Sequence, residues 1–163
     1  MKRTVNEFLK QRTVTRPTVV DAETTVEKAC QILARAGDGA ILISKNGKVR
    51  GIFSERDLLK LYSELGERSF GHLLVSEVMS LNLVGVSPVY TLEQCLLIMS
   101  KMKVRHLPVI EEGSVIHLLS LTQIAEVLVE DKDFIIHELV KYISGSQVPP
   151  DQVPTPEPQR MEN

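Results

Sequence analysis

The sequence predicts an α/β (α+β) fold of two β-α-β-β-α repeats packed as a pseudo-twofold intramolecular pair. First, residues 20–58 align with residues 86–124 at a constant offset of 66, without a gap. Second, apolar strands, amphipathic helices and turns follow in the same order in each copy. Third, a unit of about 60 residues buries only about 60% of its unfolded surface, so each copy is expected to need the other.

Each copy is predicted to begin with a short strand and an amphipathic helix. The strands are Val19-Val20 and Leu83–Val86. In the first copy, Thr24 and Glu27 have the spacing of a capping box at the start of the helix. The apolar stripes of the two helices are Val26, Ala29, Cys30, Leu33 and Ala36 in the first copy, and Leu92, Cys95, Leu96, Met99 and Met102 in the second.

A hairpin and a closing helix complete each copy. Asn46-Gly47 between two apolar runs is the strongest short hairpin signal, and Glu112-Gly113 stands at the same place in the second copy. The strands and closing helices around these turns are predicted at Ala40–Ile43, Val49–Phe53 and Glu55–Leu65, and at Leu107–Ile110, Val115–Leu119 and Leu121–Val129.

The rest of the chain flanks or joins these copies. The tail is rich in proline and poor in large apolar residues, so we expect disorder; its P-x-x-P spacing also permits a polyproline II ligand. The expected organisation is a lead-in helix (1–16), the first repeat (17–66), a spacer with the second repeat (67–130), a C-terminal helix (131–145) and the tail (146–163).

Composition narrows the function classes. The net charge is −2 with both signs interspersed, which does not support nucleic acid or an anionic membrane as a main partner. The sequence contains no apolar run of 18 residues, and residues 1–16 do not resemble a secretory signal. Cys30 and Cys95 lie on apolar helical positions, which favours buried, reduced thiols over a disulfide or a catalytic cysteine. We therefore expect a cytoplasmic protein.

The candidate functional stretch is residues 49–58, V-R-G-I-F-S-E-R-D-L. Ser54 stands where a helix N-cap is expected, and Asp57 lies three residues later, beside the positive end of the helix dipole. Gly51 weakens a strand unless backbone or a ligand approaches closely there. Gly51, Ser54 and Asp57 form what we call the first-repeat cup.

The second copy differs at two of these three positions. Ser120 is retained, but His117 replaces the glycine and Gln123 replaces the aspartate. Both copies can therefore cap their helix, an interaction worth about 1 kcal/mol, whereas only the first offers a carboxylate. The alternative interpretation is that Asp57 only caps the helix and has no role in binding. We expect one competent cleft in the first copy and a second cleft narrowed by the imidazole.

Three motifs carry a resemblance to a known family. T-T-V-E-K-A, G-I-F-S-E-R-D and V-R-H-L-P-V-I occur within a duplicated unit that resembles the cystathionine β-synthase (CBS) domain pair. The flanking segments E-F-L-K, G-E-R-S-F-G-H-L-L-V-S-E-V-M-S and I-I-H-E-L-V-K-Y-I-S-G resemble the small stand-alone pairs of bacteria and plant organelles. The resemblance implies a regulatory module without chemistry of its own. Its clefts would bind AMP, ADP or ATP, or in some members NAD(H) or S-adenosylmethionine.

The resemblance also implies roles for particular residues. Gly51, Ser54 and Asp57 match the pattern G-h-x-S/T-x-x-D, in which the acid accepts ribose hydroxyls. Residues before the L-P-V strand would contact phosphates; strand alternation allows one of them to face a given cleft, and we favour Arg105 over His106. Arg56 is a further phosphate candidate, with surface solvation as the alternative. Adenine would lie against Thr18, Val19 and the backbone of Gly39, Ala40 and Ile41.

We therefore expect a non-enzymatic homodimer that binds an adenine nucleotide and acts on an unidentified protein target. The rival is an interaction module with empty clefts. An enzyme lacks support because the sequence shows no nucleophile–base pair. A metal site also lacks support, because no paired ligand spacing joins the four histidines, His72, His106, His117 and His137.

Overall fold

A three-stranded sheet organises the first repeat in the computed structural model, which describes residues 3–12, 16–66, 70–130 and 159–160. The strand order is β1-β2-β3, with β1 parallel to β2 and β2 antiparallel to β3. Asn46 and Gly47 both have positive φ angles (53° and 74°), as the predicted two-residue hairpin requires. The elements are β1 (Val19–Asp21), α2 (Val26–Ala36), β2 (Ala40–Lys45), β3 (Lys48–Ser54) and α3 (Glu55–Leu65).

The second repeat copies this arrangement. Its hairpin turns at Glu112 and Gly113 with φ angles of 48° and 76°. The parallel pairing of Val20 with Ile43 recurs, 66 residues later, as the bridge between Val86 and Val109. The predicted pair of repeats is therefore confirmed. The elements are β4 (Val84–Gly85), α5 (Leu92–Met102), β5 (His106–Glu111), β6 (Ser114–Ser120) and α6 (Leu121–Glu130).

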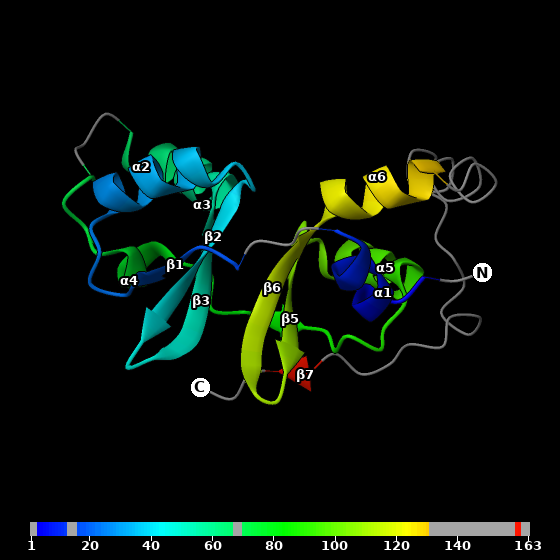
Figure 1. The fold of residues 1–163 in the computed structure, drawn as a ribbon. Coiled ribbons are helices and arrows are strands. Elements are labelled where there is room, and N and C mark those ends of the chain that lie inside the picture. Colours follow the sequence, from blue (N-terminus) through cyan, green and yellow to red (C-terminus); the bar gives the residue numbers. More distant parts are fainter. Residues whose placement is uncertain (1–2, 13–15, 67–69, 131–158, 161–163) are drawn as a thin grey trace.

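The two short helices outside the repeats are exchanged between them. Helix α1 (Val5–Gln11) packs Val5 and Phe8 into the core of the second repeat, although it precedes the first repeat in the chain. Helix α4 (Val75–Val78), from the spacer, packs Val75 into the core of the first repeat. Figure 1 shows α1 beside α5 and α4 below α2. The lead-in helix thus completes the second repeat.

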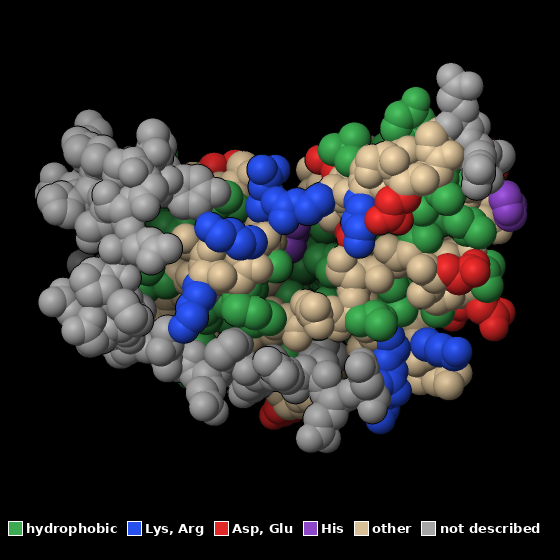
Figure 2. Space-filling view, turned by 180° about the vertical axis from the view of Figure 1, so that it is seen from behind, with side chains coloured by type: hydrophobic (Ala, Val, Ile, Leu, Met, Phe, Trp, Pro, Cys, Tyr) green, Lys and Arg blue, Asp and Glu red, His purple; other side chains and the backbone are tan. Residues whose placement is uncertain are grey.

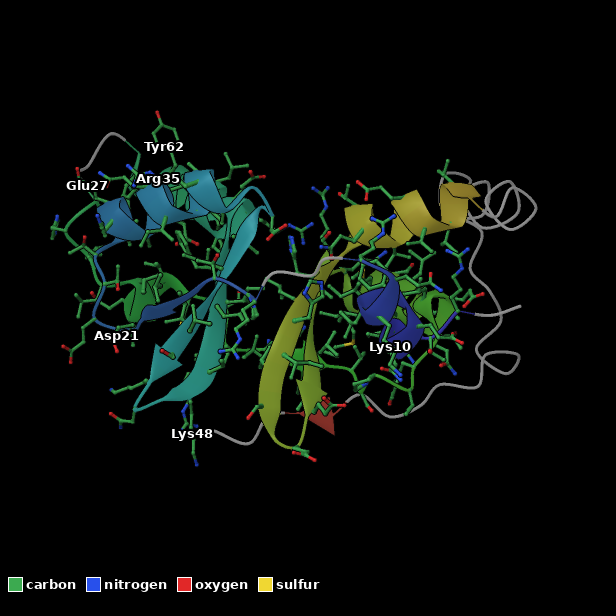
Figure 3. The ribbon with its side chains drawn as sticks, in the orientation of Figure 1. Lys10, Asp21, Glu27, Arg35, Lys48 and Tyr62 are labelled. Carbon is green, nitrogen blue, oxygen red and sulfur yellow. The ribbon has the colours of Figure 1, made fainter. Side chains whose placement is uncertain are left out.

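The cores follow the predicted stripes with small corrections. Thr25, not Thr24, caps α2, because its hydroxyl accepts from the Lys28 amide at 3.4 Å. Met102, predicted on the apolar stripe of α5, is 42% exposed, whereas Ile98 is buried. On α2, the side chains of Glu27 and Arg35 point outward (Figure 3). The buried positions of α2 are Val26, Ala29 and Leu33, and those of α5 are Leu92, Cys95, Ile98 and Met99.

The prediction of buried thiols is confirmed for Cys95, whereas Cys30 is only partly buried. Cys95 is fully buried, and burial raises the pKa of its thiol to about 12. Cys30 is only partly buried, and the same effect raises the pKa of its thiol to a smaller degree. Both are free thiols. Because a thiolate is the reactive form, neither environment activates a cysteine.

A small apolar cluster joins the two repeats. Ala40 and Leu42 of β2 meet Leu118 of β6, and all three are buried. Figure 1 shows the two hairpins facing each other across this seam, with the larger helices beyond them. The cluster explains why the copies occur together, since it covers sheet surface that each would otherwise expose.

Some predicted segments lie outside the residues that the structure describes. The C-terminal helix predicted at residues 131–145 lies outside them, as does most of the tail. Within the tail, Gln159–Arg160 form β7, a short strand antiparallel to β4 that the sequence did not predict. In the described part of the chain, no helix is long and apolar enough to cross a bilayer. Those same residues contain no cluster of three metal-ligating side chains.

Gly51 allows the spacer to extend the first sheet. The amide of Ile52 donates to the Ser80 carbonyl at 3.0 Å, and the Ser80 amide donates to the Ile52 carbonyl at 2.9 Å. A Cβ at residue 51 would collide with Cγ and Sδ of Met79 and lie 3.1 Å from the Ser80 carbonyl oxygen. The close approach that the glycine predicts is therefore made by the chain itself.

Gly51→Ala should destabilise the protein by about 1–3 kcal/mol, since the added methyl group overpacks this contact. Urea unfolding measures the change. The control is the double variant Gly51→Ala/Met79→Ala, in which the collision with the methionine is removed and part of the stability should return. Unchanged stability in the single variant would contradict the packing role of the glycine.

Candidate functional site

Asp57 lies at the centre of a small network at the start of α3. Its Oδ2 accepts from the Ser54 amide at 2.8 Å and from Ser54 Oγ at 2.7 Å. Its Oδ1 accepts from Ser80 Oγ at 2.7 Å. Asp57 therefore caps the helix, as the capping alternative requires, and is also tied to the spacer.

Sequence reasoning missed Ser80. The residue lies in the spacer, outside the aligned repeats, so the comparison of one copy with the other cannot find it. The only available signal was Gly51, which predicts a close neighbour without naming it. The contact between residues 57 and 80 depends on the bridge between Ile52 and Ser80, which no local pattern specifies.

His106 crosses the seam between the repeats. Its Nε2 donates to the carbonyl oxygen of Asp38 at 2.6 Å. A Cβ built on Gly39 would lie 3.8 Å from the Glu55 carboxylate and 3.9 Å from Cε1 of His106. His106, from the second repeat, thus adjoins the predicted base-contacting loop of the first. Strand alternation does not decide between Arg105 and His106, because β5 begins only at His106. The preference for Arg105 as a phosphate contact stays a prediction.

Burial at the seam changes the acidity of this histidine. Desolvation lowers the pKa of His106, and the Asp38 carbonyl that accepts its proton opposes the shift only in part. The nearby carboxylates of Asp38 and Glu55 also favour the charged form, whereas Arg105 disfavours it. The neutral imidazole is therefore the form that the folded seam prefers.

Arg56 and Arg105 lie beside a small cavity at the same seam. Arg56 Nη1 donates to the carbonyl oxygen of Lys103 at 2.8 Å, which links α3 to the end of α5. The cavity measures about 80 Å³ and has an apolar floor that includes Met99 and Leu121. Figure 2 shows Lys and Arg side chains gathered around a hollow between the two repeats. This surface can attract an anion.

The remaining predicted residues are divided across the first sheet. Ala40 pairs with Ser54, so the loop before β2 lies beside the first-repeat cup. The side chains of Ala40 and Ile41 are buried in the cores, which leaves only their backbone for a ligand. Thr18 and Val19 lie on the far side of β2, where the Thr18 carbonyl accepts from the Leu42 amide and Val19 is 45% exposed.

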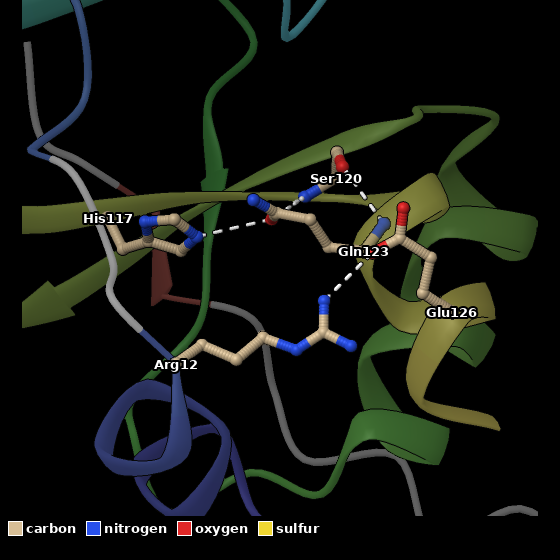
Figure 4. Close-up of polar contacts among 5 residues, drawn as sticks. All are labelled: Arg12, His117, Ser120, Gln123 and Glu126. Atoms are coloured by element: carbon tan, nitrogen blue, oxygen red, sulfur yellow. Dashed lines mark hydrogen bonds and ion pairs between the residues drawn. The ribbon is translucent and has the colours of Figure 1, made fainter. Parts of the chain in front are cut away.

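The second repeat builds a different network at the equivalent place (Figure 4). Gln123 Oε1 accepts from the Ser120 amide at 3.0 Å, and the Gln123 amide donates to Ser120 Oγ at 3.2 Å. His117 Nε2 donates to the same Oε1 at 3.2 Å. The predicted cap is confirmed here, and the amide oxygen is already used by two donors.

His117 takes the position in the second repeat that Gly51 has in the first. The imidazole is 5% exposed, and its ring centroid lies 6.1 Å from that of Phe8 on α1. Its Nδ1 is buried and has no hydrogen-bond partner among the described residues. Arg12, at the end of α1, lies 5.5 Å from the Phe8 ring centroid and pairs with Glu126 of α6 at 2.8 Å. These contacts close α1 over the second-repeat position.

Comparison with known proteins identifies the family of this arrangement. The family model described as CBS domain matches residues 9–64 and again residues 75–130. The chain belongs to the CBS-domain family. The two matches correspond to the two repeats, so the protein contains a CBS pair.

Relatives agree with this assignment. CBS domain-containing protein YhcV of Bacillus subtilis is 26% identical over 117 residues, which cover 72% of this chain and 82% of YhcV. CBSCBSPB2 of Arabidopsis thaliana is 33% identical over 123 residues, 75% of this chain but only 22% of that longer protein. The crystal structure of the CBS domain NE2398 has a TM-score of 0.73 at 30% identity and covers 79% of this chain and 99% of its own.

The lowered pKa of His106 predicts a stability that depends on pH. The unfolded chain binds the proton more readily, so this contribution is fully present above about pH 6.5 and is lost as the pH falls towards the folded pKa. His106→Gln should reduce the loss of stability between pH 7.5 and pH 5.5, measured by urea unfolding at both values. His72→Gln, at an exposed histidine, is the matched control. An identical pH dependence in His106→Gln and the unsubstituted protein would refute the assignment.

Proposed function

We propose that this CBS pair is a non-enzymatic sensor that binds an adenosine nucleotide in the cleft of its first repeat. The observation that carries the proposal is the difference between the two helix starts. The Asp57 carboxylate keeps acceptor capacity beside an exposed serine, whereas the single amide oxygen of Gln123 is used by His117 and Ser120. Of these two helix starts, the first alone offers an anion to sugar hydroxyls.

The hydrogen-bond chemistry supports a ribose at Asp57. Hydrogen bonds to a charged acceptor contribute about 1.5–3 kcal/mol, roughly twice the contribution of neutral pairs. The backbone around Gly39 and Ala40 lies next to Ser54, in reach of a base attached to that sugar. Arg56, Arg105 and His106 approach the same seam from both repeats and suit phosphate groups. Thr18, Val19 and Ile41 complete the proposed adenine contacts.

Solved CBS pairs of similar fold support the ligand class. The CBS pair of MJ0100, with a TM-score of 0.69 and 18% identity, was solved in complex with 5′-methylthioadenosine and S-adenosyl-L-methionine. CBSX2, with a TM-score of 0.63 and 24% identity, was solved in complex with AMP. Every one of these ligands contains adenosine. AMP, ADP and ATP are our first candidates here, ahead of NAD(H) and S-adenosylmethionine.

The proposed output is a change in packing between the repeats or between protomers. A ligand bound with micromolar affinity supplies about 8 kcal/mol, but it shifts a conformational equilibrium only by the difference between its affinities for the two states. The seam contacts of His106 and Arg56 lie where such a difference could arise. We propose a cytoplasmic protein that passes this change to a protein target.

An exposed apolar surface favours self-association as part of this function. Leu59 and Tyr62 of α3 are 70% and 56% exposed, and Val129 of α6 is 61% exposed. Figure 3 shows Tyr62 projecting away from the sheet. We propose that a second copy covers these helices in a homodimer, and sedimentation equilibrium gives the mass that decides between dimer and monomer. A pure interaction module with no ligand is the second candidate function, favoured by the same surface.

Asp57→Ala should weaken the binding of the nucleotide by roughly ten- to a hundredfold, because a charge-assisted hydrogen bond is lost. Isothermal titration with ATP, ADP, AMP, NADH and S-adenosylmethionine measures the affinities. Gln123→Ala is the matched control at the equivalent helix position, and its effect should be much smaller.

Two results would count against the proposal. Equal losses from Asp57→Ala and Gln123→Ala would contradict a site confined to the first repeat. The absence of heat with all five compounds at millimolar concentration would favour the interaction module.

A further inference from the structure

The hydrogen bonds that Asp57 makes with described residues leave room for only one more donor. An ionised carboxylate has about four lone-pair positions, two on each oxygen. Oδ2 already accepts from both the amide and the hydroxyl of Ser54. Oδ1 accepts from Ser80 Oγ and has one position left. Asp57 alone therefore cannot hold both hydroxyls of a ribose while it caps α3.

Ser80 supplies the missing acceptor. A serine hydroxyl has one proton and two lone pairs. Because the Ser80 proton is donated to Asp57 Oδ1, both lone pairs of Ser80 Oγ stay available to a second donor. Ser80 is exposed and Asp57 is only partly buried, so solvent reaches this pair. Oδ1 and Oγ, 2.7 Å apart, form two adjacent acceptors.

We propose that Ser80 is a ligand-binding residue that holds one hydroxyl of a vicinal diol, while Asp57 Oδ1 holds the other. The proposal rests on the proposed function, because it assigns a further contact to the nucleotide of the first repeat. It places part of the sugar site on the spacer, outside the motif shared by the two repeats. A cis diol, such as that of ribose, is the chemical group that two acceptors at this separation recognise.

The position of Ser80 is fixed by backbone contacts. Its amide and carbonyl both pair with Ile52 on β3, at 2.9 and 3.0 Å. Gly51 leaves the space that Met79 needs for this pairing. The hydroxyl is therefore held beside Asp57 before any ligand binds, which limits the ordering cost of binding.

Among the described residues, the second repeat shows no equivalent pair of acceptors. The place of Ser80 as donor to the capping residue is taken by His117, whose Nε2 donates to Gln123 Oε1. A protonated ring nitrogen has no lone pair left for a sugar hydroxyl. Because His117 is also buried beneath Phe8, the diol site is confined to the first repeat.

A ligand-side double-mutant cycle tests the contact. Affinities of the full-length protein are measured by isothermal titration for AMP, ADP and ATP and for their 2′-deoxy and 3′-deoxy forms. Ser80→Ala should weaken binding of the parent nucleotide about three- to tenfold. Removal of either the 2′ or the 3′ hydroxyl of the nucleotide, whichever contacts Ser80, should reduce the affinity of the unsubstituted protein by a similar factor. The same removal should hardly change the affinity of Ser80→Ala.

Three further variants separate this contact from packing. Ser63→Ala is the matched control, since it removes another exposed serine hydroxyl, one bonded to the Lys60 carbonyl within α3, and should keep the full discrimination. Ser80→Thr retains the hydroxyl and should keep the discrimination. Ser80→Cys retains the size but replaces a good acceptor with a weak one, so it should reproduce the loss seen in Ser80→Ala.

The outcomes distinguish the two proposals. If the unsubstituted protein binds none of the ribonucleotides, the proposed function fails and Ser80 has no sugar to contact. If it binds them and Ser80→Ala discriminates both hydroxyls as well as the unsubstituted protein does, the role of Ser80 is overturned while the nucleotide site stands. Loss of discrimination in Ser63→Ala would overturn it equally.

Discussion

The close approach of the spacer to Gly51 is the contact on which the candidate site depends. Because residue 51 has no side chain, Met79 packs against β3 and Ser80 pairs with Ile52. That pairing brings the Ser80 hydroxyl to Asp57, 23 residues away in the sequence. The packing of Met79, the pairing of Ser80 with Ile52 and the hydrogen bond from Ser80 to Asp57 therefore all depend on the absence of a side chain at residue 51. The contact that extends the first sheet is thus also the contact that positions the candidate site.

The second repeat shows what happens when this condition changes. An imidazole at position 117 occupies the space, α1 packs over it through Phe8, and the capping residue becomes a neutral amide. Both helices remain capped, so both copies keep their architecture while only one keeps a charged acceptor. In a duplicated unit, the polar groups at one helix start can therefore differ from those at the other while the fold is kept. The chemical difference between the two helix starts arises from two differences at matched positions, Gly51 against His117 and Asp57 against Gln123.

The sequence predicted what depends on local and periodic signals. The internal repeat follows from the alignment of the two copies at an offset of 66 residues. The Asn46-Gly47 hairpin and the position of α3 follow from patterns within a few residues, and the structure agrees with all three. Contacts between distant segments were not predictable in this way. The exchange of α1 and α4, the Ser80 contact and the reach of His106 to Asp38 depend on how separate elements pack. The sequence offers both Thr24 and Thr25 as the N-cap of α2 and does not distinguish them. The structure shows that Thr25 is the cap.

We propose that a nucleotide sugar binds at Asp57 and Ser80 and does not bind in the second repeat. A crystal structure of the full chain grown with the tightest-binding adenine nucleotide tests this most directly. We expect one nucleotide per chain, with its ribose hydroxyls within hydrogen-bond distance of Asp57 Oδ1 and Ser80 Oγ. A ribose bound against Gln123 and His117, with Asp57 and Ser80 left without one, would contradict it.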